Sequence, residues 1–461
     1  MASTRLEKTF TASNRKTFTI STWVKRGALT VNNTIYGAGT HDATDRDYLV
    51  FLADSGEEDK LYFNAKVSNS TVAQFYTNRR FRDLSAWYHI VLAFDTTQAT
   101  DTNRMKLYVN GEQQTFQSVT YPSQNQDMNT NNTVHKIGAT VGDGQYFNGS
   151  MTHFHFVDGT AYDASTFGET DATTGIWKPK TAPSVTYGTN GFFLKFENSG
   201  TMGTDSSPNG NNFTVNGSLT QTVDTPSNVF ATFNPLWRAR VNNIDLPTYM
   251  SNGNLTFNSG GSDARLAYFA STLGVTSGKY YWEVKHPSGS GGALGVCYNN
   301  MQSNTNAQFW DNSDLLGCVI KCNGNYFNGK SGETGTTLGV TFSNSDTYGF
   351  ALDMDNYALY AHINGTYVNS GVPTSGASRT GSLLNLLTSG LAYLNSGEPV
   401  FPFFADLATT SHAELKVNFG NGYFGTTPVA SAGLNGNGAI FEYDCPSGYY
   451  ALNTKNINTY G

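Results

Sequence analysis

The stretch from Trp87 to Gly111, WYHIVLAFDTTQATDTNRMKLYVNG, carries two alternating patterns and a turn signal after the second. Its apolar residues fall at every second position: Tyr88, Ile90, Leu92 and Phe94, and then Met105, Leu107 and Val109. Period-two alternation places one side of a strand against a core. Asn110-Gly111 then supplies two residues that tolerate a positive φ, as a tight hairpin requires. The stretch therefore predicts two adjacent antiparallel strands that share a buried face.

The same alternation recurs along the whole chain. In the first half, Phe18 to Val24 has apolar residues at most even positions, with polar Thr17, Thr19 and Ser21 between them. In the second half, strands are expected at Tyr280 to Val284, Leu294 to Tyr298, Leu316 to Lys321, Tyr348 to Asp353, Ala358 to Ile363 and Leu415 to Phe419. Every one of these segments has the length and composition of a strand in a half-buried sheet.

The last of these strands shows the alternation most cleanly. The residues expected to face the core are Leu415, Val417 and Phe419, and those expected to face solvent are Glu414, Lys416 and Asn418. Only residues 383–394, LLNLLTSGLAYL, have a composition that favours a helix, and Gly390 would keep that helix short.

Composition supports an all-β chain of two domains. Charged residues make up 14% of the 461 residues, aromatic residues 13%, and glycine accounts for 48 positions. Such a chain is poor in helix formers and rich in strand and turn formers. A single core does not serve a chain of this length. We therefore expect one β-sandwich over residues 1–223 and a second over residues 251–430.

Two further segments flank the second sandwich. Residues 224–250 contain Pro226, Pro235 and Pro247, which interrupt any long strand or helix. Their apolar residues, among them Phe230 and Phe233, predict a linker that packs against one or both domains. Residues 431–461 are rich in Gly and Asn, so we expect a C-terminal tail that is ordered by docking.

Several classes of partner and compartment are disfavoured. The net charge is −7 and no run of Lys or Arg could neutralise several phosphates, which argues against nucleic acid. No stretch approaches the ~20 apolar residues of a membrane span, and Met1 to Phe10 lacks the apolar segment of a signal peptide. Four cysteines are few for a disulfide-stapled fold, so we expect reduced thiols in a protein made in a cytosol.

Longer blocks of sequence bring in a family resemblance. The first half resembles the laminin-G-like, concanavalin-A-like domains of marine bacteriophage virion and tail proteins, through FTISTWVKRG (18–27), WYHIVLAFD (87–95), MKLYVNG (105–111), YFNGSMTHFHFVDG (146–159) and the turn-rich segment Asp205 to Thr214. The second half resembles SPRY domains, through KYYWEVK (279–285), YGFALDMDNYALYAHING (348–365) and FPFFADLATTSHAELKVNFG (401–420). The resemblance implies two tandem concanavalin-A-like antiparallel β-sandwiches, or jelly rolls.

The tandem order implies a structural protein of a bacteriophage virion. A tail fibre, a spike or a capsid-attached fibre would use the sandwiches to adhere to host-surface polysaccharide. One alternative is a purely architectural decoration or connector that binds only other virion proteins, and another is a polysaccharide-degrading enzyme. The resemblance also implies assembly in the cytoplasm of the host bacterium and homo-oligomers, trimers among them, although no heptad repeats are present to enforce one.

Two groups of residues are candidate contact sites. Asp42, Asp45 and Asp47 in HDATDRDY could give hard oxygen ligands to calcium at a loop rim. The alternative is a solvated loop in which Arg46 balances the acids. No other cofactor is expected.

A YFNG turn occurs once in each half, at 146–149 and at 326–329. An aromatic ring beside an amide can stack on a sugar and hydrogen-bond its hydroxyls. This predicts glycan contacts at Tyr146, Asn148, Tyr326 and Asn328. The alternative is an aromatic side chain folded over its own turn.

No catalytic residues are expected. Glycosidases need two carboxylates about 5–10 Å apart across a cleft. The pairs with suitable spacing are Glu57/Asp59, Asp353/Asp355 and Glu442/Asp444, and all three fall in loops, turns or the tail. His153 and His155 share one face of an expected strand but lack a third metal ligand, so we expect surface histidines. The sequence therefore favours a protein without enzymatic activity.

Overall fold

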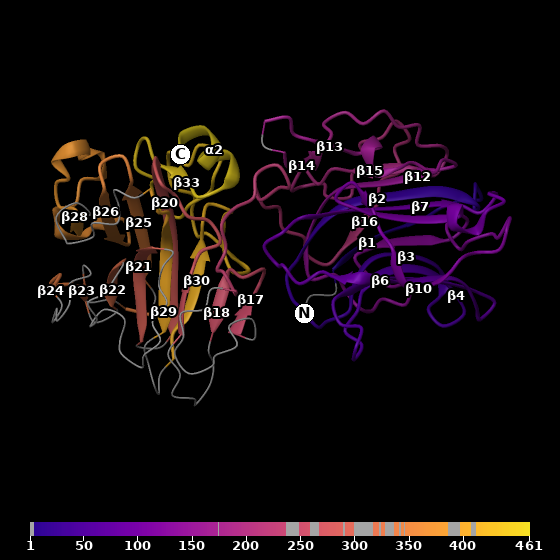
Figure 1. Cartoon of the computed structure of the whole chain (residues 1–461), viewed down its shortest axis with the longest axis horizontal. Coiled ribbons are helices and arrows are strands. Elements are labelled where there is room, and N and C mark those ends of the chain that lie inside the picture. The colour runs from indigo at the N-terminus through magenta and orange to yellow at the C-terminus, as the bar shows by residue number, and fades with distance from the viewer. Residues whose placement is uncertain are drawn as a thin grey trace. The chain divides into compact units, whose positions relative to one another are not determined.

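The computed structural model describes residues 4–173, 175–236, 249–258, 267–288, 291–298, 317–321, 324–327, 336–340, 343–344, 346–385, 397–406 and 412–461. Its chain divides into two compact units (Figure 1). The first unit comprises residues 1–221 and 225–227, and the second comprises residues 222–224 and 228–461. Both units are built almost wholly from antiparallel strands, which confirms the all-β fold class.

The first unit is a sandwich of two sheets (Figure 1). The larger sheet has the order β10 (Phe116–Thr120), β6 (Ser70–Arg80), β5 (Lys60–Val67), β4 (Asp45–Phe51), β3 (Asn33–His41), β11 (Val134–Ile137), β1 (Arg5–Thr9) and β16 (Thr214–Asn216). The smaller sheet has the order β15 (Phe192–Leu194), β12 (Gly149–Asp158), β2 (Thr17–Arg26), β7 (Tyr88–Asp95), β8 (Met105–Val109) and β9 (Glu112–Gln113).

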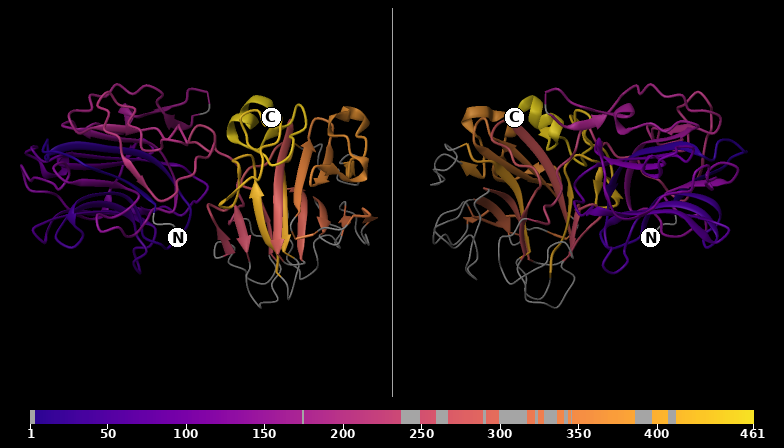
Figure 2. Two further views of the ribbon diagram at one scale, coloured as in Figure 1. Left: turned by 180° about the vertical axis from the view of Figure 1, so that it is seen from behind. Right: turned by 45° about the vertical axis from the view of Figure 1, so that its right-hand side comes forward.

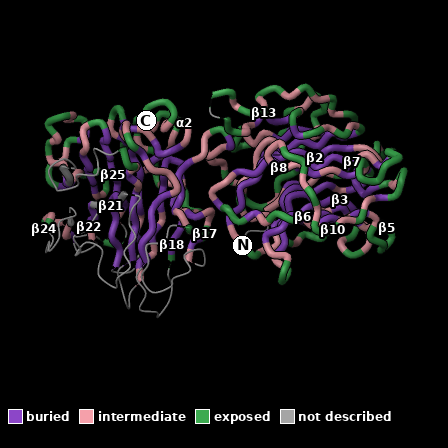
Figure 3. Tube along the Cα trace, in the orientation of Figure 1, coloured by how far each residue is buried: buried purple, intermediate pink, exposed green. Residues whose placement is uncertain are grey.

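The predicted hairpin at the opening stretch is confirmed. Strands β7 and β8 pair antiparallel with Ile90 opposite Val109 and Phe94 opposite Met105. Asn110 and Gly111 follow with φ of 50° and 87°, as a two-residue turn with two positive φ values requires. The apolar positions of both strands belong to the core of the unit, and the burial of the strands is visible in Figure 3.

The outer side of the smaller sheet is covered by residues 159–190, which we call the covering segment. It contains the short hairpin β13 (Gly168–Thr170) and β14 (Trp177–Pro179). Its Phe167 and Ala164 pack on Val91 and Val157 of the sheet. As a result β2 is buried on both faces, and the polar residues Thr19 and Ser21 are 0% exposed.

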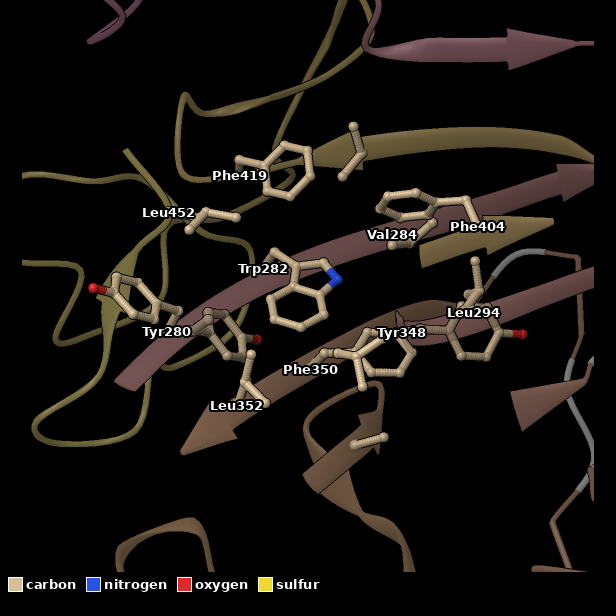
Figure 4. Close-up of a cluster of buried hydrophobic side chains, with 14 of the residues drawn as sticks. Tyr280, Trp282, Val284, Leu294, Tyr348, Phe350, Leu352, Phe404, Phe419 and Leu452 are labelled. Carbon is tan, nitrogen blue, oxygen red and sulfur yellow. The ribbon is translucent and has the colours of Figure 1, made fainter. Parts of the chain in front are cut away.

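The second unit is also a two-sheet sandwich (Figure 2). One sheet has the order β17 (Met250–Ser251), β18 (Thr256–Asn258), β30 (Glu414–Asn418), β20 (Lys279–Ser288), β25 (Thr347–Asp353), β26 (Ala358–Ile363) and β27 (Thr366–Tyr367). The other has the order β19 (Ala267–Ala270), β29 (Val400–Asp406), β21 (Gly292–Tyr298), β22 (Gly317–Lys321), β23 (Asn325–Phe327) and β24 (Thr336–Thr337). Trp282 lies in the core between them and stacks on Phe350 with ring centroids 5.5 Å apart (Figure 4).

Of the two segments that flank the second sandwich, residues 225–227 belong to the first unit and the other described residues belong to the second. Phe230 and Phe233 are buried in its core, whereas Leu236 is 79% exposed and Trp237 lies outside the described residues. In the C-terminal segment, β33 (Tyr450–Ala451) pairs parallel with β20, and α2 (Thr454–Tyr460) follows. The described residues contain no helix long and apolar enough to cross a membrane.

Two expectations for this unit need correction. Leu384 and Asn385 form the strand β28 beside β26, so the predicted helix does not begin at residue 383, and residues 386–394 of that prediction lie outside the described residues. Asn418, predicted to face solvent, is 0% exposed. Its side chain donates to Glu283 and to the carbonyl of Ile440, because the C-terminal segment packs over this part of the sheet.

Candidate functional site

A group of aromatic and amide side chains lies on the outer side of the larger sheet of the first unit. Leu49, Phe63 and Phe75 point from β4, β5 and β6 into the core. Because side chains alternate along a strand, their neighbours point to the opposite side. These neighbours are Tyr48, Tyr62, Asn64, Gln74 and Tyr76, and we call this set the tyrosine face.

Strand register places these residues in two rows that run across the sheet. Tyr62 pairs with Val50 of β4 and with Tyr76 of β6. In the next row, Asn64 pairs with Tyr48 and with Gln74. One row is therefore apolar and aromatic, and the adjacent row carries the amides.

The rings and amides of the two rows are in contact. The ring centroids of Tyr62 and Tyr76 are 4.4 Å apart, and those of Tyr48 and Tyr62 are 5.8 Å apart. Gln74 Oε1 accepts hydrogen bonds from Tyr62 Oη and from Asn64 Nδ2, both at 3.2 Å. These contacts hold the side chains in one arrangement before any ligand arrives, which lowers the entropy cost of binding.

Part of this surface remains open to solvent. Tyr48, Gln74 and Tyr76 are half-buried, and Tyr62 is 8% exposed. No described residue accepts a hydrogen bond from Gln74 Nε2. Burial raises the pKa of Tyr48 and of Tyr62, so their hydroxyls stay protonated at neutral pH. The face thus offers apolar ring surface together with neutral hydrogen-bond donors and acceptors.

The covered side of the smaller sheet holds a serine and a histidine that do not form a catalytic pair. His89 Nδ1 accepts from Trp177 Nε1 at 3.0 Å, and His89 Nε2 lies 2.9 Å from Ser21 Oγ. An indole N–H only donates, so the proton of a neutral His89 sits on Nε2 and points at Ser21. Burial lowers the pKa of His89 to about 3. Ser21 therefore accepts a hydrogen bond from His89 and is not activated as a nucleophile.

The three aspartates predicted for calcium are held by separate protein donors. The donors are Thr140 and Gly142 for Asp42, Ser68 for Asp45, and Asn129 and Thr130 for Asp47. Asp47 is 1% exposed, and burial raises its pKa to about 7. No three His, Cys, Asp or Glu side chains among the described residues form a group that could hold a metal ion. Calcium binding at these residues stays a prediction without a supporting contact.

The predicted glycan-contact residues occupy turns and short strands. Tyr146 Oη donates to the carbonyl of Asp143 at 2.8 Å, so its ring lies against its own turn. The backbone of Asn148 bonds to Gly27 and to the side chain of Asn33, which ties the turn to β3. In the second unit, Tyr326 is half-buried against the core in β23, and Asn328 lies outside the described residues. For Tyr146 these contacts favour the alternative of an aromatic folded over its own turn.

The acid pairs with glycosidase spacing are engaged in local contacts. Asp59 is 1% exposed and pairs with Arg26 and Arg82, whereas Glu57 pairs with Lys60. The other acids also have their own partners: Lys279 for Asp353, Gly278 N for Asp355, Lys285 for Glu442 and Leu434 N for Asp444. Each of these six carboxylates therefore has a local partner of its own.

The expectation of surface histidines on β12 is wrong for His155. A bulge between Thr152 and His155, with φ of 48° at His153, breaks the simple alternation. His155 is 2% exposed under the covering segment, and its Nδ1 lies 2.8 Å from Tyr187 Oη. His155 is buried because the covering segment packs over it, and the alternation pattern did not predict that segment.

Sequence reasoning missed the tyrosine face, although a signal for it exists. YLVFL (48–52), LYFN (61–64) and QFY (74–76) are apolar or amide-bearing at both parities of the strand. A strand with a bare solvent face would carry charged or small polar residues at one parity. Apolar residues on both sides indicate either a second packed layer or a contact surface.

Comparisons with known proteins bear on the first unit above all. Residues 4–165 match a laminin G family model described as the concanavalin A-like lectin/glucanases superfamily. A search of curated protein sequences finds no match to the chain.

Three solved structures share limited similarity with parts of the chain. The SPRY domain of human HERC1 is 20% identical, covers 35% of this chain and 85% of its own, and gives a TM-score of 0.24. A native heptameric SAP-like pentraxin from Limulus polyphemus is 16% identical, covers 34% of this chain and 71% of its own, and gives a TM-score of 0.27. The third structure is domain 4 of AbnA, a GH43 extracellular arabinanase from Geobacillus stearothermophilus, in complex with arabinotriose. It is 19% identical, covers 33% of this chain and 64% of its own, and gives a TM-score of 0.24. Similarities of this size do not identify the function of this chain. The family match supports the resemblance of residues 4–165 to concanavalin-A-like laminin G domains.

Proposed function

We propose that this protein binds glycans and that the tyrosine face is its contact surface. The observation that carries the proposal is the arrangement on the outer side of β4, β5 and β6, where Tyr62 pairs with Tyr76 in one row and Tyr48, Asn64 and Gln74 form the adjacent row. Aromatic rings present apolar surface to the C–H faces of sugars, and amides hydrogen-bond to sugar hydroxyls. Tyrosine side chains lose little rotamer entropy on binding, which suits a rigid sheet.

We further propose that this binding is adhesive and belongs to a bacteriophage virion. The tandem order of the laminin-G-like and SPRY-like blocks supports the virion part of the proposal. The engagement of the spaced carboxylates in local contacts supports adhesion without hydrolysis. If the proposal is right, purified protein should block adsorption of the particle that carries it, without releasing reducing ends from the polysaccharide.

The test is a glycan array probed with three forms of the full chain. Tyr76→Ala removes a ring of the tyrosine face, whereas Tyr146→Ala removes a half-buried tyrosine from a turn of the same unit. We expect the wild type and Tyr146→Ala to bind the same glycans, and Tyr76→Ala to lose about tenfold or more in affinity, because stacking on one ring is worth about 1–2 kcal/mol. Circular dichroism checks that both variants fold. Retained binding in Tyr76→Ala with loss in Tyr146→Ala would move the site to the turn, and no binding by the wild type would reject the function.

A further inference from the structure

Two cations face each other at one end of the tyrosine face. Arg46 of β4 pairs directly with Lys66 of β5. They lie one row beyond Tyr48 and Asn64, on the same side of the sheet. Like charges directly opposite each other on neighbouring strands destabilise a sheet. This arrangement therefore calls for a compensating anion.

The described residues do not provide that anion. Arg46 donates to the backbone carbonyl of Asp42, to Asn64 Oδ1 at 3.1 and 3.3 Å, and to Tyr48 Oη at 3.4 Å. Lys66 Nζ donates to the backbone carbonyl of Ala43 at 3.4 Å. All of these acceptors are uncharged. Neither cation forms an ion pair with a carboxylate in the part of the chain that the structure describes.

The acidic residues nearest in sequence are already committed. The carboxylate of Asp42 accepts from Thr140 Oγ1 and from Gly142 N at 2.9 and 3.0 Å. Asp45 Oδ1 accepts from Ser68 N at 2.8 Å. These contacts turn both carboxylates toward backbone and hydroxyl donors, which leaves the charges of Arg46 and Lys66 available to a ligand.

The guanidinium is also held in place. Its Cζ lies 4.4 Å from the centroid of the Tyr48 ring, an arrangement stabilised by cation–π attraction. Both Arg46 and Lys66 are half-buried, so each keeps part of its surface in solvent. Two residues along a strand span about 7 Å, so the cations are within reach of a substituent on a sugar that contacts Tyr48.

From these contacts we infer that the glycan bound by the tyrosine face is acidic. Its sugar rings lie on the exposed parts of Tyr48 and Tyr76, and an anionic substituent lies between Arg46 and Lys66. A carboxylate or a sulfate on the sugar has the required chemistry. This inference rests on the proposed function and adds the chemical class of the ligand.

The experiment compares charged and neutral forms of the same glycan by isothermal titration calorimetry with the full chain. One arm uses oligogalacturonate against its methyl ester, and the other uses dextran sulfate oligosaccharides against dextran. We expect at least one acidic form to bind about tenfold or more tightly than its neutral partner, with an affinity that falls as salt is raised. The arm that responds identifies the anionic group.

Variants locate the charge effect. Arg46→Gln and Lys66→Gln should each reduce binding of the acidic form about fivefold to tenfold. Lys66→Gln should leave binding of the neutral form unchanged, because Lys66 bonds to the backbone of Ala43 and not to a residue of the tyrosine face. Lys106→Gln, at a half-buried lysine on β8 of the other sheet, is the matched control and should change neither. Equal binding of acidic and neutral forms, unaffected by Lys66→Gln but lost in Tyr76→Ala, overturns the inference and leaves the proposed function standing. No binding in any arm overturns both.

Discussion

The two sheets of the first unit differ in what lies on their outer sides. The smaller sheet is covered: Trp177 of the covering segment lies over His89, and Phe167 packs on its strands. The larger sheet instead exposes part of Tyr48 and Tyr76. A chain that already buries one outer side with its own residues had the means to bury the other. This difference supports the proposal that the open aromatic side contacts a ligand.

The polar groups on the two sides follow the same division. On the covered side, Ser21, His89 and Trp177 satisfy one another, and Thr19 bonds to the backbone at residues 160 and 162. On the open side, hydrogen-bonding capacity remains at Gln74, and Arg46 and Lys66 lack an acidic partner among the described residues. A hydrogen-bond network whose polar groups all have partners favours stability. Polar groups at a surface that lack partners favour binding.

The largest effect is expected from opening the covered side. Trp177→Ala should lower the free energy of unfolding of the first unit by about 3 kcal/mol, because it removes a large ring and a hydrogen bond to His89. The ring lies so close to Gly168 that a Cβ at that position would overlap it. Hydrogen exchange of β2 and β12 peptides in the full chain measures the effect.

A neighbouring position controls for damage to the hairpin alone. Ile176 is 47% exposed, so Ile176→Ala should change the same exchange rates little. If both variants accelerate exchange equally, the ring of Trp177 is not what holds the covering segment. Binding to glycans through the tyrosine face should survive in Trp177→Ala under conditions where the unit is folded.

A second effect separates the two sides by pH. Burial lowers the pKa of His89 and of His135 to about 3, and it lowers that of His155 as well. Below about pH 6.5 these histidines are protonated in the unfolded chain but stay neutral in the folded unit. The free energy of unfolding of the first unit therefore falls as the pH is lowered toward about 3. The pKa of Asp47, raised to about 7, has the opposite sign and offsets part of this loss as the pH falls from about 7 to about 4.

The unfolding temperature should therefore be highest near neutral pH and fall on acidification, and His89→Gln should flatten the fall. Glycan binding should respond differently, because burial raises the pKa of Tyr48 and of Tyr62 and keeps their hydroxyls protonated between about pH 6 and 9. Affinity measured by calorimetry over that range, where the unit is folded, should stay constant. A variant His89→Gln with an unchanged acid profile would show that other groups carry the dependence.

Sequence alternation located strands of the smaller sheet of the first unit, among them β2, β7 and β8, and several strands of the second unit. It did not locate the strands of the larger sheet of the first unit, and it identified only one side of each strand that it found. The pattern at Tyr88 to Phe94 identified the core face because burial on that side demands apolar residues. It could not show that Ser21 is also buried, because a polar residue is tolerated there once His89 supplies a partner. The covering segment contains only short strands and turns, so its sequence has no periodic pattern that predicts it.

The candidate site was harder to predict for a different reason. Arg46 and Lys66 are far apart in the chain, and only the register of β4 with β5 makes them direct neighbours. Register depends on the turn and on the whole buried face, so a shift of either strand by one residue would send the cation of that strand to the other side. The YFNG turns, by contrast, are visible in the sequence, but Tyr146 uses its hydroxyl within its own turn.

The smallest expected effect tests the open side directly. If Arg46 and Lys66 repel each other in the absence of ligand, Lys66→Gln should raise the free energy of unfolding by about a few tenths of a kcal/mol. The same variant should bind the acidic glycan more weakly. Added salt should stabilise the wild type more than the variant, because screening relieves the same repulsion. Thermal melts at low and high salt measure both changes. A variant less stable than the wild type at low salt would mean that Lys66 stabilises the sheet through its bond to Ala43. The pair would then be a structural feature of β4 and β5, and no free energy would be stored there for a ligand to recover.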